Sequence, residues 1–252
     1  MPSISAIVIT RNEERHLQAC LESLRWADEI IVLDSFSTDR TLEIARRFTD
    51  KVYQREFVNF PTQRNAAIEL AGGDWVFFLD ADERVTPVLA DEIRSAVSSA
   101  VLQQKDAGYW VPRQNIILGR WVQYAGWCPD HQLRLFQRGK ARYDERREVH
   151  ETVVLEGQAG NLQNAIVHYN YESVGQLISR QNRYAGLEAS ALYASGVRAK
   201  PHNFVLQPLR EFKRRYIDWR GYRAGWLGLF LSLVMAWYSF MTYVKLMRMR
   251  AV

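Results

Sequence analysis

The chain has 252 residues, of which 48% are hydrophobic and 12% aromatic, and this composition excludes an intrinsically disordered protein. Its length fits one large α/β domain, or a domain of about 200 residues with an appendage. The net charge of +5 is unevenly distributed, because eleven lysines and arginines against two acids give residues 198–252 a charge of +9 and leave −4 for residues 1–197. The C-terminal segment therefore favours an anionic surface as its partner.

The two cysteines, Cys20 and Cys128, lie far apart and form no metal-binding spacing. Together with the low cysteine count, this indicates a protein that faces a reducing compartment. Residues 3–10 already have the pattern of a strand, without the apolar region and small-residue cleavage site of a signal peptide, so we expect no cleaved leader.

Strand and helix patterns alternate through the first third of the chain. β-branched and apolar runs predict strands, and apolar residues at helical spacing predict helices between them. The expected strands span 3–10, 29–33, 51–54 and 75–79, and the expected helices span 17–24, 41–48 and 62–70. This alternation predicts an α/β fold with a mostly parallel, doubly wound sheet and helices on both of its faces.

The most informative stretch is residues 75–83, an uninterrupted apolar run that ends in acidic residues. Such a run is typical of a strand buried on both faces of a parallel sheet. Asp80 and Asp82 then lie at the carboxyl edge of the sheet, where ligands bind in open α/β folds. Two carboxylates and the phosphate oxygens of a nucleotide form a site for Mg²⁺ or Mn²⁺. The alternative is a turn or a helix cap, which acids after a strand also form.

After a helix expected at 87–102, the pattern changes to short, aromatic-rich strands separated by turns. These strands are expected at 108–117, 120–124, 132–137, 142–143, 149–155 and 165–169. They predict a small mixed or antiparallel extension of the sheet. A long helix at 173–195 is expected to close the globular domain. In this part of the chain, Trp121, Tyr124 and Trp127 are candidates for a ligand-stacking wall or for core residues.

The C-terminal segment combines basic residues with an apolar run. Residues 226–244 contain no charged side chain, which approaches the length needed to span a bilayer. Cations lie on both sides of this run, and polar residues dilute its second half. These features favour basic and apolar helices that lie in the membrane interface or re-enter one leaflet. A soluble helix packed on the preceding globular domain is the alternative.

Several motifs in this order resemble the family 2 glycosyltransferases, the inverting enzymes of the GT-A (Rossmann-like) fold. The motifs are residues 7–14, 32–39, 63–67 and 78–82, followed by 130–136 and 149–151. The last two resemble more narrowly the branch that adds glucose to the lipopolysaccharide inner core. The resemblance implies a GT-A domain at 1–197, with a nucleotide-binding half at 1–85 and an acceptor half at 105–197, and a membrane-associating tail at 198–252.

The resemblance also implies which residues bind the nucleotide and the metal. The nucleotide-binding candidates are Thr10, Arg11, Glu13, Asp34, Arg64, Asp80 and Ala81. The metal candidates are Asp82, Asp80 and His150. Structural alternatives are a helix cap for Asn12, an Asx turn for Asp34 and a solvent-exposed position for Arg64.

An inverting transfer requires a carboxylate that takes a proton from the acceptor hydroxyl. The resemblance assigns this general base to Asp130, with Glu151 as the alternative, although Pro129 replaces the family's usual acidic neighbour. In the second loop, Phe36 and Arg40 also depart from the family pattern, which leaves the turn and the donor preference open. The Gln-x-x-Arg-Trp element of processive synthases is missing, which indicates a single addition.

The leading hypothesis is a metal-dependent transferase that moves glucose from UDP-glucose to a lipid-anchored saccharide, such as the inner-core heptose of lipopolysaccharide. No nucleic acid is expected as a partner. The expected location is the cytoplasmic face of the inner membrane, as a peripheral or monotopic protein. The alternatives are transfer to a polyprenyl phosphate, for which Asp130 matters little because the acceptor is already ionised, and a non-catalytic nucleotide-sugar-binding module.

Overall fold

The computed structural model describes residues 2–103, 106–145 and 153–249, which divide into two compact units. The first unit contains residues 1–113 and 130–168, and the second contains residues 114–129 and 169–252. The functional boundary expected after residue 197 lies inside the second unit.

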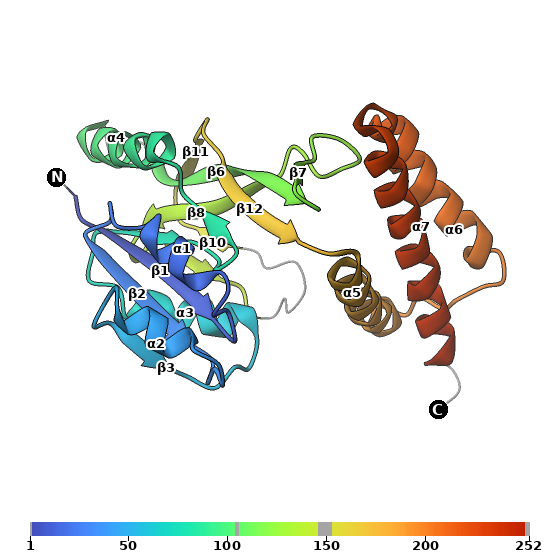
Figure 1. Cartoon of the computed structure of the whole chain (residues 1–252), viewed down its shortest axis with the longest axis horizontal. Helices are drawn as coiled ribbons and strands as arrows, with labels where there is room; N and C mark the ends of the chain where they lie inside the picture. Colours follow the sequence, from blue (N-terminus) through green and yellow to red (C-terminus); the bar gives the residue numbers. More distant parts are fainter. Residues whose placement is uncertain (1, 104–105, 146–152, 250–252) are drawn as a thin grey trace. The chain divides into compact units, whose positions relative to one another are not determined.

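The first unit contains the alternating strands and helices (Figure 1). Its elements are β1 (Ile4–Thr10), α1 (Leu17–Glu22), β2 (Glu29–Asp34), α2 (Thr41–Arg46), β3 (Val52–Gln54), α3 (Phe60–Glu69), β4 (Trp75–Phe78), β5 (Glu83–Arg84), α4 (Pro87–Gln103), β8 (His131–Gln137), β9 (Ala141–Tyr143), β10 (Val153–Leu155) and β11 (Gln158–Asn161). Two longer strands, β6 (Asp106–Ile117) and β12 (Ile166–Tyr171), begin in the first unit and end in the second.

The main sheet has a parallel half and an antiparallel half. Its strand order is β3-β2-β1-β4-β8-β6-β12-β5, with β11 and the short β7 (Arg120–Trp121) beside β6. The strands β1, β2, β3 and β4 pair in parallel, whereas β8 is antiparallel to both β4 and β6, and β12 is antiparallel to β5. The predicted α/β class, with an extension of mixed strand direction, is therefore confirmed.

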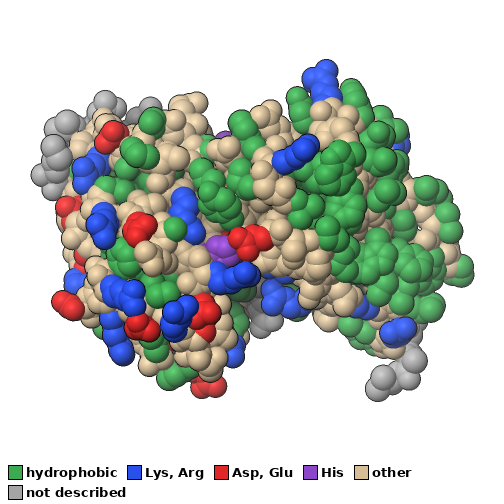
Figure 2. Space-filling model, viewed as in Figure 1, with side chains coloured by type: hydrophobic (Ala, Val, Ile, Leu, Met, Phe, Trp, Pro, Cys, Tyr) green, Lys and Arg blue, Asp and Glu red, His purple; other side chains and the backbone are tan. Residues whose placement is uncertain are grey.

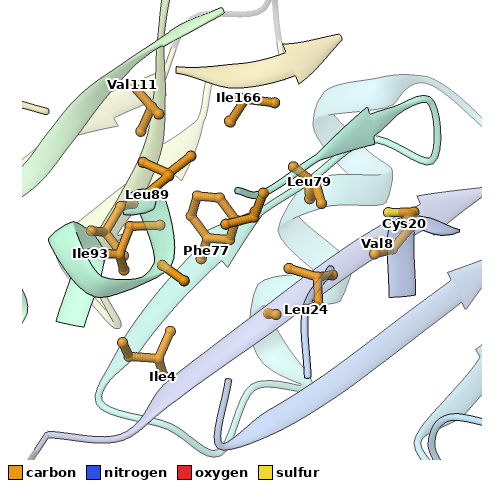
Figure 3. Close-up of a cluster of buried hydrophobic side chains, with 14 of the residues drawn as sticks. Ile4, Val8, Cys20, Leu24, Phe77, Leu79, Leu89, Ile93, Val111 and Ile166 are labelled. Carbon is orange, nitrogen blue, oxygen red and sulfur yellow. The ribbon is translucent and has the colours of Figure 1, made fainter. Parts of the chain in front are cut away.

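The strand β4 is buried on both faces, as its apolar run predicts. Trp75 and Phe77 belong to one core cluster, and Val76 and Phe78 belong to another. This alternation follows from the two-residue period of a strand. Figure 3 shows Phe77 in the first cluster, together with side chains from the strands and from α4. Fully burying each such side chain contributes about 1.5–3 kcal/mol relative to leaving it exposed.

Gly73, just before β4, allows a close approach to β1. A Cβ atom on Gly73 would lie 2.7 Å from the Ser5 side-chain oxygen and 2.9 Å from the Ser5 backbone nitrogen. The Gly73 amide also donates a hydrogen bond to the Ser5 hydroxyl at 2.8 Å. A residue without a side chain is therefore required where β4 enters the sheet.

The second unit is built around two long helices. Its helical elements are α5 (Val174–Ala194), α6 (Asn203–Lys213), a π-helical turn (Arg214–Asp218), a 3₁₀ turn (Gly221–Ala224) and α7 (Gly225–Arg248). Leu177 of α5 and Leu227, Leu231 and Val234 of α7 share one hydrophobic cluster. By contrast, α6 contains no buried residue.

The helices of the second unit expose many apolar side chains. In Figure 2, hydrophobic side chains dominate the visible face of these helices. The most exposed are Val205, Leu209, Ile217, Trp226 and Leu233, each more than half exposed. Residues 221–248 form the one helical stretch in the described residues that is long and apolar enough to cross a membrane, with a mean hydropathy of 1.6 in its best window.

Some elements differ from the sequence-based expectation. The expected strand 120–124 is limited to Arg120–Trp121, and the strands β5 and β11 were not expected. Both unexpected strands are short and lack an apolar run, so their formation depends on pairing with β12 and β6. Part of the strand expected at 149–155 lies outside the described residues.

Candidate functional site

The carboxyl ends of β1, β2 and β4 form one edge of the sheet. In the register of the sheet, Thr10 lies opposite Asp34, and Asp80 follows the end of β4. The Thr10 hydroxyl is buried and has no hydrogen-bond partner among the described residues. Because buried hydroxyls in proteins are almost always hydrogen-bonded, this orphan oxygen is consistent with a ligand that binds at the edge.

The loops after β1 and β2 are tied to each other. The Asn12 side-chain oxygen accepts a hydrogen bond from the Thr38 amide at 2.8 Å, and the Asn12 amide donates to the Ser37 hydroxyl at 2.8 Å. The Glu13 amide donates to the Thr41 hydroxyl at 2.8 Å. Asn12 therefore links two loops and is not a helix cap, since His16 occupies the N-cap of α1. Glu13 is partly buried, and Arg11 is exposed beside it.

Asp34 organises its own loop. Its buried carboxylate accepts hydrogen bonds from the Ser37 amide at 2.9 Å, from the Ser37 hydroxyl and from the Gln54 side chain at 3.1 Å. The Ser37 amide is three residues on, one more than in an Asx turn, but the carboxylate has the loop-ordering role of the structural alternative. Within this loop, Phe36 adopts a left-handed backbone with φ of 53°. That conformation costs of order 1–3 kcal/mol in a bulky residue and is held by the surrounding hydrogen bonds.

Asp80 lies between two arginines. Arg64 of α3 contacts one carboxylate oxygen at 2.9 Å, and Arg134 of β8 contacts the other. Burial opposes ionisation of Asp80, but the Arg134 and Arg64 guanidinium groups outweigh it and hold the pKa of Asp80 well below its usual range. Arg64 is itself buried, and its guanidinium lies over the rings of Phe78 and Tyr143 at 5.4 Å from each centroid. The solvent-exposed alternative for Arg64 is therefore wrong.

The ion pairs continue from Asp80 to Asp130 as an alternating row of acids and arginines. Arg134 also contacts Glu83 at 3.1 Å, and Glu83 contacts Arg113 at 3.4 Å. Arg113 in turn contacts Asp130 at 2.8 Å. We call these residues, together with Arg64 and Asp80, the ion-pair row. Three carboxylates and three guanidinium groups balance in charge, which offsets the cost of placing Glu83 at zero exposure.

Asp82 lies apart from the ion-pair row. One Asp82 carboxylate oxygen is 3.6 Å from Nε2 of His168 on β12. Both side chains are largely buried, at 17% and 10% exposure. Ala81, between the two aspartates, is buried, and its carbonyl accepts a hydrogen bond from Arg84 at 2.8 Å.

The donor atoms at Asp82 and His168 are suitable for a divalent ion. A carboxylate oxygen and an imidazole nitrogen are accepted by Mn²⁺, and Mg²⁺ is held by one or two carboxylates with substrate phosphates. In residues 2–103, 106–145 and 153–249, no three acidic, histidine or cysteine side chains gather into a complete metal site. An ion at this place would therefore take some of its ligands from a bound substrate. The predicted ligand His150 and the alternative base Glu151 lie outside the described residues.

Four residues of this region were not predicted from the sequence to be functional: Glu83, Arg113, Arg134 and His168. The first three belong to the ion-pair row, and His168 lies opposite Glu83 in the β5–β12 pairing. One signal was available, since Glu83 and Arg134 lie inside motifs that carry the family resemblance or directly beside them. Arg113 and His168 stand in strands without any local pattern that marks them.

The arrangement suits the binding and transfer of an anionic group. The buried Thr10 hydroxyl and Asp80 lie at the sheet edge, and Asp80 begins the ion-pair row, whose three arginines lead to Asp130. Guanidinium groups recognise phosphate oxygens in a fixed, two-pronged geometry.

Comparison with solved structures supports the fold. A mannosyltransferase from Pyrobaculum calidifontis, solved with GDP-mannose and Mn²⁺, matches with a TM-score of 0.56 and 16% identity, covering 97% of this chain and 87% of the other. TarS of S. aureus, residues 1–349 with UDP-GlcNAc, matches with a TM-score of 0.51 and 15% identity, covering 99% of this chain and 91% of the other. The expected GT-A fold is thereby confirmed.

Comparison with known sequences identifies the family. Residues 5–151, more than half of the chain, match the family described as glycosyl transferase family 2. The lipopolysaccharide core biosynthesis glycosyltransferase LpsC of Rhizobium meliloti is 30% identical, over 98% of this chain and 93% of the relative. An uncharacterized glycosyltransferase of Rickettsia felis is 28% identical, over 98% of this chain and 90% of the relative. The chain therefore belongs to glycosyl transferase family 2, and it is a glycosyltransferase.

Proposed function

We propose that this glycosyltransferase moves one glucose residue from UDP-glucose to a lipid-anchored saccharide, such as the inner-core heptose of lipopolysaccharide, with inversion at the anomeric carbon. The observation that carries the proposal is the ion-pair row, because it joins a phosphate-suited group of arginines to a partly exposed carboxylate, Asp130. The nearly full-length similarity to LpsC, a protein named for lipopolysaccharide core biosynthesis, supports the acceptor class.

The nucleotide binds at the edge formed by β1, β2 and β4. Thr10, Arg11, Glu13 and Asp34 line the side of the base and ribose, with Asp34 acting through the loop that it orders. Arg64 is directed toward the diphosphate from α3. Asp80 and Ala81 stand where ribose and diphosphate meet. In this assignment the orphan Thr10 hydroxyl gains its hydrogen-bond partner from the ligand.

A divalent ion, Mg²⁺ or Mn²⁺, would be held by Asp82, with Asp80 and His150 as further ligands, and would offset charge on the diphosphate oxygens when bound. The residues of this chain perform the remaining steps. Arg64 and Arg134 contact the leaving diphosphate as its negative charge grows. Because both arginines already hold Asp80, their orientation requires no reorganisation during transfer.

Asp130 acts as the general base. Its side chain is 21% exposed, so an acceptor hydroxyl can reach it. The hydroxyl proton moves to the Asp130 carboxylate while the hydroxyl oxygen forms its bond to the anomeric carbon, and the diphosphate leaves with the electron pair of the broken bond. Glu151 is the alternative base.

We further propose that the second unit holds the enzyme on the cytoplasmic face of the membrane as a peripheral or monotopic protein. The exposed side chains of α6 and α7 supply apolar contact with lipid, and the positive charge of residues 198–252 favours anionic headgroups. Several of these cations have acidic partners in the unit, among them Lys213 with Asp218 at 2.8 Å. Apolar insertion is therefore expected to contribute more to the affinity than charge alone.

The decisive experiment compares full-length wild type, Asp130→Asn, Glu151→Gln and Asp82→Ala on a panel of nucleotide sugars, with and without Mg²⁺ or Mn²⁺. We expect Asp130→Asn to keep donor affinity and to lose turnover by about 10²- to 10⁴-fold, the range for a general base. We expect Asp82→Ala to lose metal-dependent donor binding. If Glu151→Gln loses turnover and Asp130→Asn does not, the roles of the two acids exchange.

The same panel tests the alternatives. Full turnover of Asp130→Asn with a polyprenyl phosphate as acceptor would support transfer to that lipid, since its phosphate is already ionised. Unchanged transfer by Asp82→Ala with divalent metal would refute the metal assignment.

Membrane binding is tested separately with liposomes of anionic or neutral lipid. Val205→Ser with Leu209→Ser, on the exposed face of α6, is expected to weaken binding to anionic liposomes. Val88→Ser on α4 is the matched control, because Val88 is equally exposed in the first unit. If the wild-type protein ignores anionic liposomes at low salt, the membrane assignment fails.

A further inference from the structure

Asp130 is held by Arg113 at two levels. The Arg113 backbone amide donates to the Asp130 carbonyl at 2.7 Å. In the side chains, Nε and Nη2 of Arg113 lie 2.9 Å and 2.8 Å from the same carboxylate oxygen, Oδ2 of Asp130. The other oxygen, Oδ1, accepts a hydrogen bond at 3.0 Å from the uncharged amide of Gln132. The two oxygens of Asp130 therefore differ, since one carries the guanidinium and the other an amide.

Arg113 is in turn fixed by a buried acid. Its Nη1 lies 3.4 Å from Oε1 of Glu83, and Glu83 has zero exposure. Glu83 is held from the other side by Arg134 at 3.1 Å and accepts the Asp80 amide at 2.9 Å. A guanidinium braced in this way presents a fixed direction to Asp130, which a lysine of flexible stem would not reproduce.

We propose that Arg113 is a positioning residue for the transfer reaction: braced by Glu83, it keeps Asp130 ionised and directs Oδ1 toward the acceptor hydroxyl. This inference rests on the proposed function, in which Asp130 is the general base. It assigns a role to an arginine that does not contact the donor in that proposal.

The positive charge of Arg113 acts on the Asp130 carboxylate. A cation in contact with a carboxylate favours the charged form, so the base stays available at lower pH. The guanidinium on Oδ2 makes Oδ1 the more basic oxygen, and Oδ1 receives the acceptor proton. The protonated base then returns this proton to water, and the ion pair with Arg113 reforms.

Arg113 and Gln132 contact the Asp130 side chain from two neighbouring strands. Arg113 faces it from β6, Gln132 faces it from β8 without charge, and Glu83 of β5 acts on it through Arg113. Loss of the Arg113 charge should therefore move the acid limb of the pH profile upward, because the base would then protonate at higher pH.

The test measures kcat and kcat/KM against pH for the full-length protein, with UDP-glucose and a heptose-terminated core oligosaccharide. Arg113→Gln removes the charge, and Arg113→Lys keeps the charge but lacks the planar, two-pronged guanidinium group. For Arg113→Gln we expect the midpoint of the acid limb to move upward by roughly 1–3 pH units, the usual effect of losing an adjacent opposite charge. The KM for the donor should stay unchanged. For Arg113→Lys we expect an acid limb close to wild type and a lower kcat. Arg47→Gln is the control, because Arg47 pairs with Glu43 on the exposed surface of α2.

The outcomes separate this inference from the proposed function. If Asp130→Asn keeps wild-type turnover and its acid limb, Asp130 is not the base and the proposed function fails. If Asp130→Asn loses turnover but Arg113→Gln keeps both the wild-type acid limb and kcat, the role of Arg113 is refuted. Should Arg113→Gln fail to fold, the kcat of Arg113→Lys tests the proposal instead. A wild-type kcat without the guanidinium group would overturn it.

Discussion

Replacement of Arg134 by methionine is expected to destabilise the first unit strongly. The Arg134 side chain is 5% exposed and holds both Asp80 and the fully buried Glu83. Methionine fills a similar volume but leaves Glu83 with Arg113 at 3.4 Å and Asp80 with Arg64 at 2.9 Å. Removing one partner of a buried ion pair costs about 3–5 kcal/mol, because the remaining carboxylate keeps its desolvation penalty.

That loss is large against the total stability of a folded domain, which is about 5–15 kcal/mol. At about 2–4 °C of Tm for each kcal/mol in a chain of this size, the expected fall in Tm is about 6–20 °C. Tryptophan fluorescence during urea or thermal unfolding measures it, since Trp75 is buried in the same unit.

Two further variants test the reasoning behind this number. Arg142→Met is the control, because the Arg142 side chain is 76% exposed and its loss should change stability by less than about 0.5 kcal/mol. The double variant Glu83→Gln with Arg134→Met should lose less than the sum of the single losses, since it removes the buried charge together with its partner. An Arg134→Met protein within about 1 kcal/mol of wild type would refute the view that Arg134 compensates buried charge.

Three other predictions follow from separate features. Burial opposes ionisation of Glu29, but hydrogen bonds from Lys51, Ser5 and Gly72 outweigh it and lower the pKa of Glu29 from 4.5 to about 2; the stability advantage of wild type over Glu29→Gln should be complete above pH 4.5 and shrink as the pH falls toward 2, in urea titrations at each pH. Gly73→Ala should cost about 1–3 kcal/mol in the same assay, because its Cβ would overlap Ser5, and a neutral result would contradict the close approach. Burial raises the pKa of the Cys20 thiol, so a thiol reagent should modify the partly exposed Cys128 in the native protein and Cys20 only after unfolding; rapid native labelling of both would be inconsistent with this packing.

The sheet edge was predictable from the sequence because it depends on local patterns. The apolar run that ends at Asp80 indicates a doubly buried strand, and the parallel pairing of β1, β2 and β4 brings Thr10 and Asp34 to the same edge. The choice between the two roles of Asp34, and between the two roles of Arg64, required the structure, since only tertiary contacts show that Arg64 is buried against two aromatic rings.

The ion-pair row was not predictable in the same way. Glu83 and Arg113 are 30 residues apart, and Glu83 and Arg134 are 51 apart, so no helical or strand period connects them. Their contact depends on the antiparallel pairing of β6 with β8 and on the position of β5, and the two-residue strand β5 has no signature of its own. For the same reason His168 could not be predicted, because its proximity to Asp82 arises from the pairing of β12 with β5.

The hydrogen bonds between the loops after β1 and β2 restrict which sequence changes these loops tolerate. Asn12 uses its side chain and its amide to hold Thr38 and Ser37, so each loop depends on the other for its shape. A loop ordered in advance costs a nucleotide little conformational entropy on binding. The same dependence makes substitutions at Asn12 and Ser37 non-additive, so that changing both should cost less than the sum of the single changes. Among natural variants, residues in these two loops should accordingly be replaced together, as a pair inherited in matched combinations.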